Sequence, residues 1–241
     1  MTMFPQTDWA RLAVLRDGLE EDKREVLGEL YTRYRDPIMG FLRGKGHAAD
    51  RAEDLVQDFF LYSIEHHLFE KADQERGRFR NLVLSALNHF TANAERAEHA
   101  QVRHPHGGLV AEADLAGESG EGQLGADPDN PERLFLRAWA ETLIRRVLTA
   151  LSVEYAAPGR LVHFEIFSRL LTAPILDGIE APTQRALAVE LGLSEKEVAN
   201  RLLTARRAYQ RLLRAEIALY AGSEEEVDSE VRDLFSQLGI D

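Results

Sequence analysis

One stretch of the chain, which lies between Gly107 and Pro131 and reads GGLVAEADLAGESGEGQLGADPDNP, limits what the rest can fold into. It is rich in glycine and acidic residues, contains no aromatic residue and has no periodic apolar face. A segment of this composition cannot bury enough apolar surface to offset the entropy lost on ordering. We therefore predict a flexible acidic linker over residues 105–131, with a separate folded domain on each side.

Both flanking regions show apolar residues at helical spacing, and neither shows the alternation that is typical of strands. We expect an all-α protein with a helical bundle over residues 1–104, a helix-turn-helix domain over 132–222 and an acidic helical tail over 223–241. Pro37 is expected to kink the second helix or to start a new one. The expected helices cover approximately residues 8–17, 20–34, 48–67, 78–100, 132–155, 159–172, 182–191 and 195–220, with a last one from 223.

Composition restricts the function classes. The 241 residues carry a formal net charge of −12 and include no cysteine, which excludes disulfides and thiolate chemistry. No apolar run approaches the roughly 20 residues that span a bilayer, so we expect a soluble cytoplasmic protein. A DNA duplex repels so acidic a chain except where local basic surface is present. Arginine clusters within residues 76–103 and 196–214, and these two segments are the candidates for such surface.

The segment from Pro182 to Arg214 predicts a helix-turn-helix unit. Thr183 is a candidate cap for a short helix, Gly192 supplies the turn, and Ser194 with Glu197 matches a capping box at the start of the second helix. The first helix is expected to face inward through Leu187, Val189 and Leu191. The second has an apolar stripe of Val198, Leu202, Ala205, Tyr209 and Leu212.

The opposite side of that second helix carries groups that can read DNA. Asparagine can pair with adenine, arginine with guanine or phosphate, and methyl groups with thymine. The alternative is a surface helix that happens to carry arginines, and Leu203 equally fits a protein contact. The face consists of Lys196, Asn200, Leu203, Arg207 and Arg214, flanked by Thr204 and Arg211.

Two helices of the N-terminal region have distinctive faces. The helix after Gly77 has a polar stripe without acids, which suits phosphate and exposed bases, or is a solvated face. The helix before it has an acidic stripe beside apolar groups, which suits docking on a basic protein surface, or is again a solvated face. The polar stripe contains Arg78, Asn81, Ser85, Asn88, Arg96 and His99. The acidic stripe contains Asp54, Asp58 and Glu65, with Leu61 among them. The apolar face beside the acidic stripe contains Leu55, Phe59 and Tyr62.

The order of several motifs resembles RNA polymerase sigma factors of the extracytoplasmic-function type, and above all a large subgroup abundant in planctomycetes. The run AEDLVQDFF at residues 52–60 is followed by ERGRFR at 75–80. The likeness covers nearly the whole chain apart from the linker. It continues through PERLF at 131–135, Trp139, Glu154 and Tyr155, the helix start at 193–197, Tyr209, the run at 212–217 and the tail from Val227.

The resemblance implies a transcription initiation factor that binds core RNA polymerase and promoter DNA and is not an enzyme. The implied contacts on the polymerase are the β′ clamp helices and the β flap. A regulator such as an anti-sigma factor is a further candidate partner. No membrane, metal or cofactor is expected. The resemblance assigns polymerase docking to Asp54, Leu55, Gln57, Asp58 and Leu61. It assigns contact with the −10 element to Arg76, Arg78, Arg80, Asn81, Asn88 and Arg96. It assigns contact with the −35 element to Ser194, Lys196, Asn200, Arg201, Thr204, Arg207 and Arg211.

The chain also departs from this family. Where the family's region-two helix continues with a tryptophan and a basic Lys-Arg-Gly-Gly-like end, this chain has Glu95 and VRHP at residues 102–105. The region-four helix has Ala199, Leu203 and Thr204 where basic residues are common. A sigma-like adaptor for a protein partner and a free helix-turn-helix regulator are therefore alternatives. No phosphate-binding loop, dinucleotide turn, nucleophile elbow or zinc-protease motif indicates an enzyme.

Overall fold

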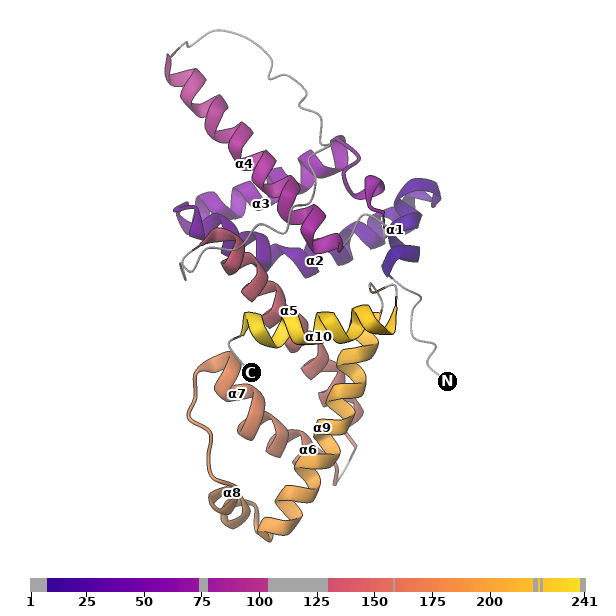
Figure 1. Cartoon of the computed structure of the whole chain (residues 1–241), viewed down its shortest axis with the longest axis vertical. Coiled ribbons are helices and arrows are strands. Elements are labelled where there is room, and N and C mark those ends of the chain that lie inside the picture. Colours follow the sequence, from indigo (N-terminus) through magenta and orange to yellow (C-terminus); the bar gives the residue numbers. More distant parts are fainter. Residues whose placement is uncertain are drawn as a thin grey trace. The chain divides into compact units, whose positions relative to one another are not determined.

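The chain is all-helical where its structure is described, and this confirms the expected fold class. A computed structural model describes residues 8–73, 78–103, 130–157, 159–218, 221 and 223–238, and none of these residues lies in a strand. The chain divides into two compact units, Met1–Trp139 and Ala140–Asp241 (Figure 1). Most of the predicted linker lies outside the described residues.

The N-terminal unit is a bundle held together by aromatic and aliphatic side chains. Phe41, Phe59 and Leu87 are fully buried, and the ring of Phe59 meets that of Phe90 edge-on, with centroids 5.6 Å apart. Its elements are α1 (Asp8–Asp17), α2 (Glu20–Gly44), α3 (Ala49–Glu65), the 3₁₀-helix η1 (Phe69–Lys71), α4 (Phe79–Arg103) and the beginning of α5 (Pro131–Glu154).

Helix α2 continues through Pro37, so the expected fresh start at this proline is wrong. A proline inside a helix removes one backbone hydrogen bond and crowds the preceding turn. Tyr34, Ile38 and Phe41 on either side are buried in the bundle. Tertiary packing of this face therefore outweighs the local cost.

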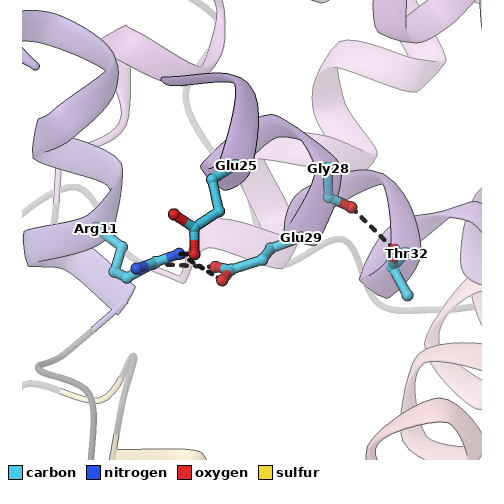
Figure 2. Close-up of polar contacts among 5 residues, drawn as sticks. All are labelled: Arg11, Glu25, Gly28, Glu29 and Thr32. Carbon is cyan, nitrogen blue, oxygen red and sulfur yellow. Dashed lines mark hydrogen bonds and ion pairs between the residues drawn. The ribbon is translucent and has the colours of Figure 1, made fainter. Parts of the chain in front are cut away.

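Helices α1 and α2 are joined by one arginine and two glutamates (Figure 2). Arg11 Nε donates to Glu29 Oε2 over 3.0 Å, and Arg11 Nη2 donates to Glu25 over 3.2 Å and to Glu29 Oε1. Exposed ion pairs contribute about 1 kcal/mol at most. The cluster therefore orients α1 on α2 more than it stabilises the bundle.

The first turns of α5 pack within the N-terminal unit. Phe135 is fully buried, and its ring lies nearly parallel to that of Tyr34, with centroids 6.5 Å apart. A Cβ atom added at Gly40 would lie 3.2 Å from the carbonyl oxygen of Leu134, so this glycine permits the close approach of α2 and α5. The division of the chain therefore falls inside α5, at Trp139, and not at residue 132 where the sequence placed the start of the C-terminal domain.

The C-terminal unit is built around one long helix, α9, which α6, α8 and α10 all contact. Ile166, Leu187, Val198 and Ile217 are fully buried in it. The helix expected to end at Thr172 continues, through a π-helical turn, to Asp177, and Gly178 after it has a left-handed φ of 65°. The elements are the rest of α5, α6 (Leu161–Phe167), the π-helix η3 (Ser168–Thr172), α7 (Ala173–Asp177), α8 (Gln184–Leu191), α9 (Glu195–Ala218) and α10 (Glu224–Gln237).

The expected helix in the acidic tail is present as α10. The hydroxyl of Ser223 caps it by accepting a hydrogen bond from the backbone N–H of Glu226 over 3.2 Å. Val227 and Leu234 are buried, so α10 packs as part of the C-terminal unit and is not a separate tail. Among the described residues, no helix has the length and hydropathy that would let it cross a membrane.

Candidate nucleic-acid interface

Helices α8 and α9 follow one another across a short turn at Gly192 and carry the predicted caps. The hydroxyl of Thr183 accepts from Ala186 N over 3.1 Å at the start of α8. At the start of α9, Ser194 Oγ accepts from Glu197 N over 3.2 Å, and Glu197 Oε2 accepts from Ser194 N over 2.8 Å. This reciprocal pair is the expected capping box, and it holds the pKa of Glu197 below its usual range.

Gly192 makes the turn between the two helices. Its φ of 65° and ψ of 33° place it in the left-handed region, where a side chain is strained. Leu193 N then donates to Ala188 O over 2.8 Å, which satisfies a carbonyl at the end of α8. The direction in which α9 leaves α8 therefore depends on this glycine.

A small apolar core fixes α9 against α8 and α6. Ile166, Leu187, Ala188 and Val198 are buried together, and Leu191 and Leu202 pack against them. The apolar stripe expected on α9 is confirmed, because Val198, Ala205, Tyr209 and Leu212 are buried. Val189 was expected to face inward, but it is 79% exposed. An eight-residue helix has room for only one inward stripe, and Leu187 with Ala188 occupies it.

The opposite face of α9 is accessible. Lys196, Asn200 and Arg207 are exposed, and their side chains make no hydrogen bond or ion pair to any described residue. Leu203, 48% exposed, lies among them, and Arg201 is half-buried. These are the groups of the predicted −35 face that remain available to a ligand.

Three other members of that predicted face are engaged within the chain. Ser194 is used in the capping box, and the hydroxyl of Thr204 donates to Asn200 O over 2.9 Å, which leaves its methyl group exposed. Arg211 forms an ion pair with Glu154 of α5 over 2.6 Å. Arg214, also on the polar side, pairs with Asp228 and Glu224 of α10 over 2.5 and 2.7 Å.

On α4, the predicted −10 face is partly covered by α5. Arg80 is only 6% exposed, and its Cζ atom lies 4.4 Å from the centroid of the Trp139 ring. A guanidinium in this position gains a cation–π contact away from water. Arg80 therefore packs inside the N-terminal unit, which corrects its assignment to DNA contact.

Asn88 is held by the same segment of α5, because its Nδ2 donates to Glu132 Oε1 over 3.0 Å. Arg96 is exposed and bonds along its own helix, from Nη2 to Asn93 Oδ1 over 2.7 Å. Asn81 and Arg78 are half-buried. Arg76 lies outside the described residues, so its prediction stays untested. The accessible polar surface of α4 is therefore smaller than the sequence indicated.

The acidic side of α3 is exposed as predicted, with one correction. Asp54, Gln57 and Asp58 are exposed, and Leu61 among them is 59% exposed. Leu55 was expected to contact the polymerase, but it is buried in the bundle because it lies about 100° around the helix from Asp54.

Sequence reasoning missed three residues that shape these faces. Ile64 is 44% exposed and lies one helical turn from Leu61, so it extends the apolar part of the α3 surface. Trp139 and Glu132 cover the polar stripe of α4. The spacing from Leu61 could have indicated Ile64, whereas no local pattern links α4 with residues so far along the chain.

Comparisons of the chain with protein-family models, with curated proteins and with solved structures find no match. Function is therefore inferred from the residues and their geometry.

Proposed function

We propose that this chain is a sigma-like transcription initiation factor that binds core RNA polymerase through α3 and directs it to promoter −35 and −10 elements. The observation that carries the proposal is the exposed polar face of α9 on a capped helix-turn-helix. In such units the second helix enters the major groove and its outward side chains meet base edges.

The accessible groups of α9 have the chemistry for this role. The amide of Asn200 can pair with adenine, Arg207 can pair with guanine or phosphate, and Lys196 near the helix start can hold a phosphate. The exposed methyl groups of Leu203 and Thr204 suit the methyl group of thymine.

Charge explains why a polymerase is needed. With a formal net charge of −12, the chain is repelled by DNA at long range. When the chain is bound to a polymerase that itself holds DNA, its two weak contacts with the promoter form within one complex. The effective concentration of the DNA near the chain is then high. The proposed promoter binding is therefore a property of the complex and not of the free chain.

The face of α3 supplies the proposed anchor. Asp54 and Asp58 provide negative charge, and Leu61 and Ile64 provide exposed apolar surface beside it. An apolar patch bordered by acids suits a partner surface that is basic at its edge.

The test is run-off transcription with core polymerase from the source organism, using fragments of its genome as templates and sequencing the transcripts. We expect defined start sites that depend on the chain. Arg207→Ala should reduce transcription without loss of polymerase binding, and Asp58→Lys should reduce polymerase binding itself.

Two exposed positions provide matched controls. Arg16→Ala on α1 and Asp22→Lys on α2 make the same changes of charge away from the proposed faces and should leave transcription unchanged. Equal transcription by Arg207→Ala and wild type would contradict the assignment of the reading face.

A sigma-like adaptor that binds a protein partner without opening promoters is the second candidate. It is favoured by the engagement of Arg80 with Trp139 and of Asn88 with Glu132, which removes two groups from the −10 face. An adaptor would bind the polymerase, or another protein, and give no run-off transcript.

A further inference from the structure

The C-terminal unit contains a cavity that the proposed function does not use. Its volume is about 490 Å³, within the range of small-molecule sites, and α10 packs against α9 beside it (Figure 1). The site is open to solvent, since Arg206 of its lining is exposed.

The wall of the cavity is mainly apolar. Helices α5, α6, α7, α9 and α10 and the π-helix η3 all contribute side chains, so the site is formed by the folded unit as a whole. The apolar lining includes Ile144, Phe167, Leu171, Ile175, Leu213 and Phe235.

One positive charge of the lining is not neutralised. Arg206 is exposed and makes no ion pair or hydrogen bond to a described residue. Arg214, the other cation of the lining, is already paired with Asp228 and Glu224. None of the described residues that line the cavity is acidic. The site therefore offers one guanidinium beside an apolar volume.

Two further features set this wall apart from ordinary core. Leu171 and Thr172 come from η3, and π-helical turns occur frequently at functional sites. Tyr209 is buried, and its burial raises the pKa of its hydroxyl. That hydroxyl has no hydrogen-bond partner among the described residues.

We propose that this cavity binds a small amphipathic monoanion, a medium-chain aliphatic or an aromatic carboxylic acid, with its apolar body among Leu171, Ile175 and Leu213 and its carboxylate on Arg206. A single guanidinium matches a single carboxylate, because its planar fork can donate two parallel hydrogen bonds. The described lining residues include no acid, which favours an anion over a cation, and the apolar walls favour a hydrocarbon body over a sugar or a phosphate ester.

The proposal does not depend on a role in transcription. Its test contains neither DNA nor polymerase, so the two can fail separately. Calorimetry with the full chain would compare octanoate, below its micelle concentration, with the neutral probe 1-octanol. We expect octanoate to bind about tenfold more tightly than 1-octanol, since hydrogen bonds to charged groups contribute more than neutral ones.

Two variants distinguish the contribution of the Arg206 charge from that of the apolar wall. Arg206→Gln should weaken octanoate binding about tenfold and leave 1-octanol binding unchanged. Arg185→Gln, the same change at an exposed position of α8, should alter neither.

Methyl NMR spectra should show octanoate-dependent shifts at Ile175 and Leu213. Equal affinity of the wild type for the two probes, no binding of octanoate at millimolar concentration, or shifts confined to other methyl groups would each overturn the proposal.

Discussion

Helices α4 and α9 both carry a polar face opposite an apolar stripe, yet the two faces have different surroundings. On α9, Lys196, Asn200 and Arg207 are exposed and make no bond to a described residue. On α4, Arg80 is buried against Trp139, and Asn88 donates to Glu132. The comparison teaches that a polar face on a helix is not yet an accessible surface, because a segment far along the chain can cover it.

The difference has a local cause in α5. Its first turns are held in the N-terminal unit by the burial of Phe135 and by the close approach that Gly40 permits. With Phe135 buried in the N-terminal unit, Glu132 and Trp139 lie close enough to α4 to contact Asn88 and Arg80. The covering of α4 is thus coupled to the packing of one aromatic side chain.

The largest expected effect comes from removing that side chain. Phe135→Ala should destabilise the N-terminal unit by about 3–5 kcal/mol, because it leaves a cavity at a fully buried aromatic position. Amide hydrogen exchange along α2 would measure the loss. Leu203→Ala, on the exposed face of α9, is the control and should change stability by less than about 0.5 kcal/mol. A loss below about 1 kcal/mol for Phe135→Ala would mean that α5 does not hold the covering in place.

A pair of arginine substitutions tests the contrast directly. Arg80→Ala should destabilise the N-terminal unit by about 2 kcal/mol through the lost cation–π contact, without changing the DNA affinity of a polymerase complex. Arg207→Ala should do the reverse and lower that affinity by about 1–3 kcal/mol with little change in stability. Denaturant unfolding and fluorescence anisotropy with promoter DNA would measure the two. A loss of affinity in Arg80→Ala with stability intact would restore this residue to the DNA-binding face.

Capping of α9 should have a smaller effect. Ser194→Ala removes both side-chain bonds that Ser194 shares with Glu197 and should destabilise the C-terminal unit by about 1 kcal/mol. Urea unfolding, monitored by amide hydrogen exchange in α9, would measure this loss of stability. Ser194→Asp, which keeps an acceptor at the cap, should recover stability relative to the alanine variant. Equal losses in the two variants would show that the cap contributes little.

The smallest effect concerns pH in the C-terminal unit. Burial lowers the pKa of His163 below its ordinary 6.5, and the charges of Arg201 and Arg160 act in the same direction. The unfolded chain then takes up a proton more readily than the folded one, so stability should fall as pH decreases through 6.5 and level off below the lowered pKa. Urea unfolding between pH 8 and pH 5 would measure this slope. His163→Gln should flatten it, and an unchanged slope in that variant would assign it to other groups.

Local patterns predicted much of this molecule from sequence. The all-α class, the caps at Thr183 and Ser194, and the buried stripe of α9 depend on neighbours within one or two turns. The helix does not start afresh at Pro37, because tertiary burial outweighed a local rule. Val189 was assigned to the wrong side, since short amphipathic patterns leave the edge of a buried stripe uncertain. The pattern placed Leu55 correctly on the apolar face of its helix, and only the resemblance placed it among the polymerase contacts.

The covering of Arg80 could not be predicted in this way. It needs the register of α5 against α4, and that register is set by contacts between residues widely separated along the chain. The same holds for the cavity in the C-terminal unit, whose wall gathers side chains from several helices.

The π-helical turn at Ser168–Thr172 has a consequence for how this chain could tolerate change. A π-turn holds one residue more than the α-helical turn it replaces, so deleting a single residue there would let the segment relax to α geometry. Because the extra residue is absorbed within that turn, everything between the deletion and Gly178 would nearly keep its orientation relative to α6. Phe167 before the turn and Ile175 after it would then both remain in the cavity wall. The π-turn is therefore the place where this segment could lose one codon without exchanging the faces that it presents.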